Sequence, residues 1–180
     1  KPSELTPKTS EIITKIVESV FHKNQVSVIE GGIAVSQQLL SERWDYIFFT
    51  GSVAVGKIVA KAAAENLTPV TLELGGKNPC VIDETANLKL AAKRIVWGKF
   101  MNAGQTCIAP DYILIQKDMK SHFVDYMKDE ITKAYGENPK NSPDFARIIN
   151  TKNWQRLVSM IDPKKVIFGG QAESNNCYIA

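Results

Sequence analysis

Short apolar runs that end at glycine, each beside a segment of helical character, most constrain how this chain can fold. The run 46–49 ends just before Gly51, and the run 70–74 ends directly before Gly75. Between them, residues 54–64 are rich in alanine and lysine, which favours a helix. Strands that alternate with helices in this way predict a parallel sheet with helices on its faces.

The same two patterns extend along the rest of the chain. Thr6 followed by Pro7 favours a helix start, and apolar residues then recur at helical spacing as far as Val20. Further helices are expected where apolar residues recur every three or four positions, over 37–40, 88–101, 119–134 and 153–160. The helix over 88–101 is expected to bury one face, formed by Leu88, Ala91, Ile95 and Phe100. Further strands are expected at short apolar runs, over 26–29, 81–83, 112–115, 166–168 and 177–179.

Composition and charge are those of an ordinary globular chain. Of the 180 residues, 44% are hydrophobic and 23% are charged, which is enough apolar material for a substantial core. The formal net charge of +3 is small and evenly spread, so nucleic-acid binding is not expected. No apolar stretch approaches the roughly 20 residues of a membrane-spanning helix, and the first residues do not resemble a signal peptide. We therefore expect a cytoplasmic chain without a membrane segment.

Cysteine and histidine usage bears on the compartment and on metal binding. The three cysteines, Cys80, Cys107 and Cys177, are widely spaced and odd in number, which indicates a reducing compartment rather than a disulfide framework. The two histidines, His22 and His122, are isolated from each other and from the cysteines. No metal site is therefore expected.

The turn 51–57 is the first candidate for a binding site. Glycine between a buried strand and a helix start exposes backbone N–H groups, and the helix dipole favours a phosphate or pyrophosphate there. The spacing of Gly51, Gly56 and Lys57 nearly forms a triphosphate-binding loop, but Ile58 stands where a magnesium-binding Ser or Thr is needed. A tight turn without a ligand is the alternative.

Two side chains with reactive groups follow. Glu73 lies at the carboxyl end of the strand 70–74, where open α/β sheets bind ligands, and burial there would raise its pKa toward that of a general base. The alternative is a strand-end glutamate paired with a lysine such as Lys77. Cys107 lies on a loop among small residues, where a cysteine can act as a nucleophile; its alternative is an inert, half-buried thiol.

Three short motifs follow one another along the chain: Phe-Thr-Gly-Ser at 49–52, Leu-Glu-Leu-Gly-Gly-Lys-Asn-Pro at 72–79 and Asn-Ala-Gly-Gln-Thr-Cys at 102–107. In this order they resemble the signatures of the aldehyde dehydrogenase family. The opening residues 1–4 resemble the family's adenosine-ribose motif. The stretches 68–74 and 105–112 are most similar to the class 3 branch, which includes fatty aldehyde dehydrogenases. The resemblance covers essentially the whole chain.

The resemblance implies part of a Rossmann-like nucleotide-binding domain in 1–76 and part of an α/β catalytic domain in 77–180. It also implies oxidation of an aldehyde to a carboxylic acid. Cys107 would be the nucleophile, and the reaction would pass through a thiohemiacetal and then a thioester on its sulfur. Glu73 would activate the water that hydrolyses the thioester, and the backbone N–H of Cys107 would supply one oxyanion donor. By this resemblance the chain is a central piece of a longer enzyme, and we expect the piece alone to be inactive.

The cofactor implied by the resemblance is NAD, with NADP also open because class 3 enzymes often accept both. Lys1 and Glu4 would bind the hydroxyls of the adenosine ribose, and a ribose-binding carboxylate normally disfavours the 2′-phosphate of NADP. Ser52 would contact the pyrophosphate, Val55 would line the adenine side, and the backbone of Leu74 would lie near the nicotinamide amide. The other implied cofactor-binding residues belong to the same glycine turn and are Gly51, Val53, Ala54 and Gly56.

The implied partners are a small-molecule aldehyde and a second copy of the protein in a dimer. Two other function classes stay open at this point. One is a P-loop-like nucleotide triphosphatase that uses the turn 51–57, which magnesium-dependent ATP hydrolysis would favour. The other is a catalytically inactive fragment or binding module that keeps the fold.

Overall fold

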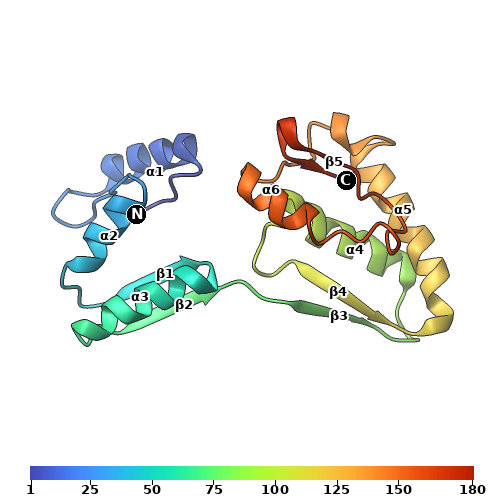
Figure 1. The fold of residues 1–180 in the computed structure, drawn as a ribbon, viewed down its shortest axis with the longest axis horizontal. Coiled ribbons are helices and arrows are strands. Elements are labelled where there is room, and N and C mark those ends of the chain that lie inside the picture. Colours follow the sequence, from blue (N-terminus) through green and yellow to red (C-terminus); the bar gives the residue numbers. More distant parts are fainter. The chain divides into compact units, whose positions relative to one another are not determined.

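The computed structural model describes all 180 residues, which form two compact units, Lys1–Leu74 and Gly75–Ala180 (Figure 1). The first unit contains α1 (Pro7–Val20), α2 (Ile33–Ser41), β1 (Ile47–Gly51), α3 (Val53–Glu65) and β2 (Val70–Leu74). The second contains β3 (Asn78–Ile82), α4 (Leu88–Phe100), η1 (Met101–Gly104), β4 (Pro110–Ile115), η2 (Lys117–Met119), α5 (Lys120–Tyr135), η3 (Pro139–Asn141), α6 (Thr151–Val158), β5 (Ala172–Glu173), η4 (Ser174–Asn176) and β6 (Tyr178–Ile179). None of these helices is long and apolar enough to cross a membrane.

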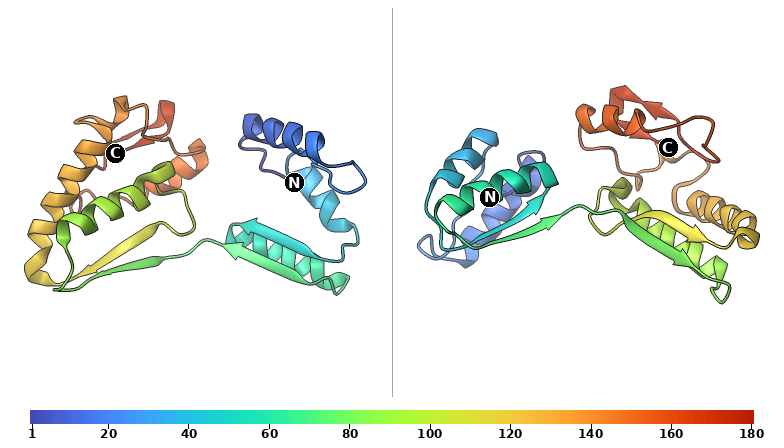
Figure 2. Two further views of the ribbon diagram at one scale, coloured as in Figure 1. Left: turned by 180° about the vertical axis from the view of Figure 1, so that it is seen from behind. Right: turned by 60° about the horizontal axis from the view of Figure 1, so that its bottom comes forward.

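In the first unit, α3 connects the parallel strands β1 and β2 and packs on one face of them (Figure 2). Successive residues of a strand point to opposite faces. The side chains of Leu72 and Leu74 approach Gly56 of α3. Glu73, between these two leucines, therefore lies on the face away from α3.

In the second unit, α4 connects the parallel strands β3 and β4, and α5 packs beside α4. One core cluster of this unit consists of Ile82 of β3, Ala92 and Ile95 of α4, and Phe123 of α5. The inward face predicted for this helix is confirmed at Ile95, and Leu88 and Ala91 pack against the same core. Phe100 is partly buried outside this cluster, where its ring packs against that of Tyr135. Helices joined to parallel strand pairs in both units confirm the predicted α/β class.

Two of the predicted strands are wrong. Residues 26–29 and 166–168 lie outside any strand, although both runs are apolar. A strand needs a hydrogen-bonded neighbour to satisfy its backbone groups, and neither run pairs with another segment. Two other strands differ from the predicted ranges. β3 begins at Asn78 rather than at residue 81, and β6 is one residue shorter than the strand expected over 177–179.

Candidate active site

Cys107 lies on the loop between η1 and β4, and its thiol is exposed rather than half-buried. Its carbonyl oxygen accepts a hydrogen bond from Nδ2 of Asn78 at 2.7 Å. No hydrogen bond within the chain uses its backbone N–H. A free N–H beside a thiol is the arrangement needed to stabilise an oxyanion on a carbonyl that the thiol attacks.

Three consecutive residues of left-handed backbone precede this loop. Asn102, Ala103 and Gly104 have φ values of 54°, 52° and 75°. Glycine is required at the third position, because an added Cβ at Gly104 would also lie 3.1 Å from the carbonyl oxygen of Lys99. Non-glycine residues persist in this conformation only where the surrounding structure holds them.

The side-chain amide of Gln105 provides this support by joining the loop to a distant segment. Its Nε2 donates to the carbonyl oxygens of Asn102 and Arg147, both at 3.0 Å, and its Oε1 accepts from the N–H of Ile149 at 2.9 Å. The side-chain amide of Asn102 donates to the carbonyl oxygen of Gln105 at 3.3 Å. The Asn102 side chain thus adds one further hydrogen bond within the loop.

An aromatic cluster fixes the segment that receives Gln105. Phe145 is buried, and its ring centre lies 5.0 Å from that of Tyr135 and 6.0 Å from that of Tyr178. The Arg147 guanidinium lies 5.1 Å from the centre of the Tyr178 ring and donates to the carbonyl oxygen of Phe145 at 2.7 Å. Burial, with the nearby Asp144 carboxylate as a smaller cause, raises the pKa of Tyr135. The cysteine loop thus rests on a packed part of its own unit.

Glu73 lies one residue before the end of β2, but its predicted burial is wrong, since the side chain is exposed. The reason is its place on the sheet face away from α3, where Phe48 of β1 is also 66% exposed. Lys77, the lysine considered as its partner, forms an ion pair with Asp111 at 3.4 Å. Glu73 belongs to the first unit and Cys107 to the second.

The turn after β1 is a tight connection into α3. The Oγ of Ser52 accepts a hydrogen bond from the N–H of Val55 at 3.3 Å and so caps the helix. The five predicted cofactor-binding residues at the start of the turn are exposed: Gly51, Ser52, Val53, Ala54 and Val55. Ile58 is 58% exposed and carries no hydroxyl, so this turn lacks the magnesium ligand of a triphosphate-binding loop.

Gly56, which is buried, lets α3 approach β2 closely, and this approach can be tested. An added Cβ would lie 2.9 Å from Cδ2 of Leu74, so Gly56→Val is expected to lower the free energy of unfolding by about 1–3 kcal/mol. At Gly98 of α4 an added Cβ would meet only Cδ of Pro110, at 3.8 Å, so Gly98→Val is the matched control with a smaller expected loss. Urea unfolding of the intact protein measures both, and equal losses would contradict the close approach.

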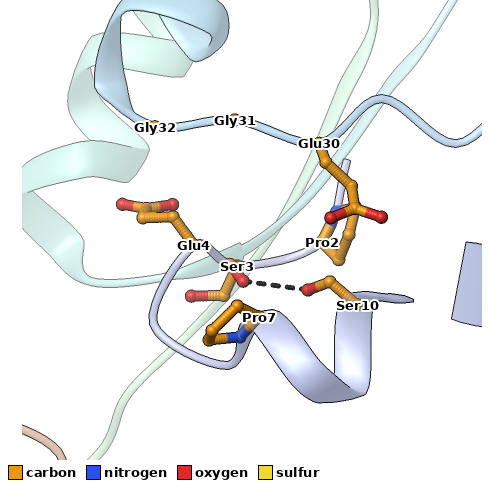
Figure 3. A pocket seen from close by; sticks show the side chains of 8 residues that line it. All are labelled: Pro2, Ser3, Glu4, Pro7, Ser10, Glu30, Gly31 and Gly32. Atoms are coloured by element: carbon orange, nitrogen blue, oxygen red, sulfur yellow. Dashed lines mark hydrogen bonds between the residues drawn. The ribbon is translucent and has the colours of Figure 1, made fainter. Parts of the chain in front are cut away.

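A hollow of about 210 Å³ lies beside the opening residues of the first unit (Figure 3). Its lining comes from the opening loop, the start of α1 and the segment before α2, and consists of Pro2, Ser3, Glu4, Pro7, Ser10, Glu30, Gly31 and Gly32. The hydroxyl of Ser10 donates to the carbonyl oxygen of Ser3 at 3.1 Å and holds the opening loop on α1. The carboxylate of Glu4 forms an ion pair with Nζ of Lys1 at 3.3 Å. A backbone hydrogen bond is the larger cause, and Lys1 the smaller one, that holds the pKa of Glu4 below its usual value.

The segment before α2 contributes three residues to this hollow that the sequence did not single out. Oγ1 of Thr14 donates to Oε1 of Glu30 at 2.6 Å and ties the segment to α1. Gly31 has a φ of +143°, and an added Cβ would lie 2.5 Å from Cγ2 of Val35, so only glycine fits. At Gly32 an added Cβ would meet no atom within 4 Å, so the space beside it is open.

These residues form an α/β protein with an exposed thiol in one unit and, in the other, a hollow beside the opening residues and a capped helix start. The family model described as "Aldehyde dehydrogenase family" matches residues 1–179. The chain belongs to the aldehyde dehydrogenase family, which confirms the resemblance of its three motifs.

Three relatives illustrate this membership. The chain is 48% identical over 181 residues to 4,4'-diaponeurosporen-aldehyde dehydrogenase of Staphylococcus aureus, covering 99% of this chain and 39% of the relative. It is 48% identical over 180 residues to aldehyde dehydrogenase family 3 member A2 of Macaca fascicularis (100% and 37%). It is 47% identical over 180 residues to the "dimeric NADP-preferring" aldehyde dehydrogenase of Mus musculus (100% and 40%). The chain spans about two fifths of the length of these relatives.

Solved structures agree with the fold. The substrate-bound state of Staphylococcus aureus AldH has a TM-score of 0.91 and 47% identity, over 99% of this chain and 40% of that chain. A betaine aldehyde dehydrogenase double mutant from Staphylococcus aureus, in complex with NAD⁺, has a TM-score of 0.83 and 28% identity, over 99% and 39%. The predicted Rossmann-like α/β class is thereby confirmed.

Proposed function

We propose that the protein oxidises an aldehyde to a carboxylic acid with NAD or NADP as the oxidant. One observation carries this proposal: the exposed thiol of Cys107 lies beside its own unpaired N–H, on a loop that other side chains hold in place. Family membership supplies the reaction class. A homodimer belongs to the same proposal, because the Mus musculus relative is named a dimeric enzyme.

Cys107 forms and later releases the covalent bond to the substrate. Its sulfur, as thiolate, bonds to the aldehyde carbon, and the negative charge moves to the carbonyl oxygen. The backbone N–H of Cys107 can donate to that oxygen, since no group of the chain competes for it. After oxidation, the acyl group is held on the sulfur as a thioester.

Glu73 is the proposed base for release of the acid. Its carboxylate takes a proton from water, and the water oxygen attacks the thioester carbon. The carbon–sulfur bond breaks, and Cys107 leaves as a thiolate. The side chain of Glu73 is exposed, so its carboxylate is accessible to the water that it would activate.

The first unit has features that fit a dinucleotide. The hollow beside Glu4 is open above Gly32, and the capped start of α3 presents the positive end of a helix of 13 residues. Lys1 and Glu4 would hold the adenosine ribose, the turn 51–56 the pyrophosphate, and the end of β2 the nicotinamide amide. The bound nucleotide would supply the hydride acceptor for the oxidation.

Glu4→Gln tests the ribose contact. A neutral amide binds ribose hydroxyls more weakly than a carboxylate, so the KM for NAD is expected to rise by about tenfold, with kcat unchanged. Loss of the negative charge should also improve the use of NADP relative to NAD. Steady-state kinetics with both nucleotides measure these effects. Glu11→Gln on the exposed side of α1 is the matched control, and an unchanged KM in Glu4→Gln would exclude the contact.

The experiment that tests the proposed function measures oxidation by the intact protein. Aliphatic and aromatic aldehydes are supplied with NAD⁺ or NADP⁺, and the reduced nucleotide and carboxylic acid are quantified together. We expect equal amounts of the two products with at least one aldehyde class. No aldehyde-dependent reduction would contradict the proposal, and magnesium-dependent ATP hydrolysis in its place would favour a triphosphatase.

A further inference from the structure

The pairing of β3 with β4 lacks backbone hydrogen-bond donors at the start of the two strands, which is the end of β4 next to Cys107. Pro79 and Pro110 have no backbone N–H, and both lie at the start of their strands. The register also shifts there, because Asn78 lies opposite Pro110 and Pro79 lies opposite Tyr112. The backbone ladder therefore fixes the cysteine end of β4 poorly.

The side chain of Asn78 supplies two donors at this point. Its Nδ2 donates to the carbonyl oxygen of Cys107 at 2.7 Å and to that of Ala109 at 3.0 Å, on either side of Ile108. An amide nitrogen has two protons, so this group is fully used. Gly76 leaves room for the side chain, since an added Cβ there would lie 3.1 Å from Oδ1 of Asn78.

We propose that Asn78 is a positioning residue for Cys107 that acts through these two carbonyl groups and does not touch the substrate. This proposal rests on the proposed function, since it takes Cys107 as the nucleophile. Ile108 is 78% exposed, so apolar packing does not hold the loop at this residue. The Asn78 bonds fix the carbonyl of Cys107, and through it the direction of the neighbouring side chain and N–H.

Asn78→Leu tests the role, because leucine has a similar branched shape but no hydrogen-bond donor. In the intact protein, we expect backbone hydrogen exchange in a peptide covering 105–110 to quicken about tenfold, as for a lost hydrogen bond. We expect kcat for aldehyde oxidation to fall about 10- to 100-fold, the cost of a misplaced reacting group. The KM for NAD should not change, because the residues proposed to bind it lie in the other unit. Asn141→Leu, at an exposed position of η3, is the matched control.

A second variant, Asn78→Ser, keeps one donor and should give exchange and kcat values between those of the wild type and Asn78→Leu. It also carries the test if Asn78→Leu does not fold. Unchanged exchange over 105–110 would overturn the positioning role whether or not the protein oxidises aldehydes. Faster exchange with an unchanged kcat would overturn it as well. A wild-type protein inactive on all aldehydes would instead contradict the proposed function, while exchange still reports whether Asn78 holds the loop.

Discussion

Cys107→Ala is expected to abolish aldehyde-dependent reduction of the nucleotide, with kcat lowered about 10⁴-fold or more. The substitution removes the sulfur that would bond to the aldehyde carbon and carry the acyl group. Hydrolysis of simple esters should be lost in the same variant, because it would pass through the same thioester. Steady-state kinetics of the intact protein, with and without nucleotide, measure the two losses.

Cys80→Ala is the matched control for this prediction. Cys80 is partly buried in β3 and packs against the core of the second unit, so its loss should lower stability while leaving kcat near that of the wild type. If Cys107→Ala keeps wild-type turnover, Cys107 is not the nucleophile. If both variants lose activity equally, the loss reflects damage to the unit and not removal of a reactive sulfur.

Glu73→Gln is expected to separate the two halves of the reaction. Glutamine has the shape of glutamate but cannot take a proton from water, so hydrolysis of the thioester should slow about 10²- to 10⁴-fold. The first turnover does not need this step. Rapid mixing with aldehyde and NAD⁺ should therefore give a burst of reduced nucleotide of about one per site, followed by slow turnover.

Glu65→Gln is the control for Glu73→Gln. Glu65 is the exposed last residue of α3, and it carries the same charge on the neighbouring element of the same unit. We expect this variant to turn over like the wild type without a burst. Unaltered steady-state turnover in Glu73→Gln would show that another group activates the water.

The apolar pattern and the flanking turn residues were sufficient to predict the strands and helices that position the candidate site. The strand over 70–74 was predicted with its observed bounds, because β-branched and apolar residues lie between Pro69 and Gly75. Residues 26–29 show the limit of this reasoning, since a β-prone run forms no strand without a partner. Whether a partner exists is a property of the fold and not of the run.

The residues that hold the cysteine loop could not be predicted from the sequence in the same way. Asn78 acts on a carbonyl 29 residues away, and Gln105 acts on an N–H 44 residues away. Amide side chains carry no periodic signal, so only the folded backbone identifies their partners. The exposure of Glu73 likewise depends on what covers its face of the sheet, which the apolar pattern of β2 does not specify.

The mass of the peptide that contains Cys107, taken from Glu73→Gln protein quenched after mixing with an aldehyde and NAD⁺, tests directly whether Cys107 carries the acyl group. Our prediction is that this peptide gains the mass of one acyl group of the supplied aldehyde, and that the gain is absent without NAD⁺. An acyl group on Cys80 or Cys177 instead, or no acyl group on any cysteine while the acid is formed, would contradict it.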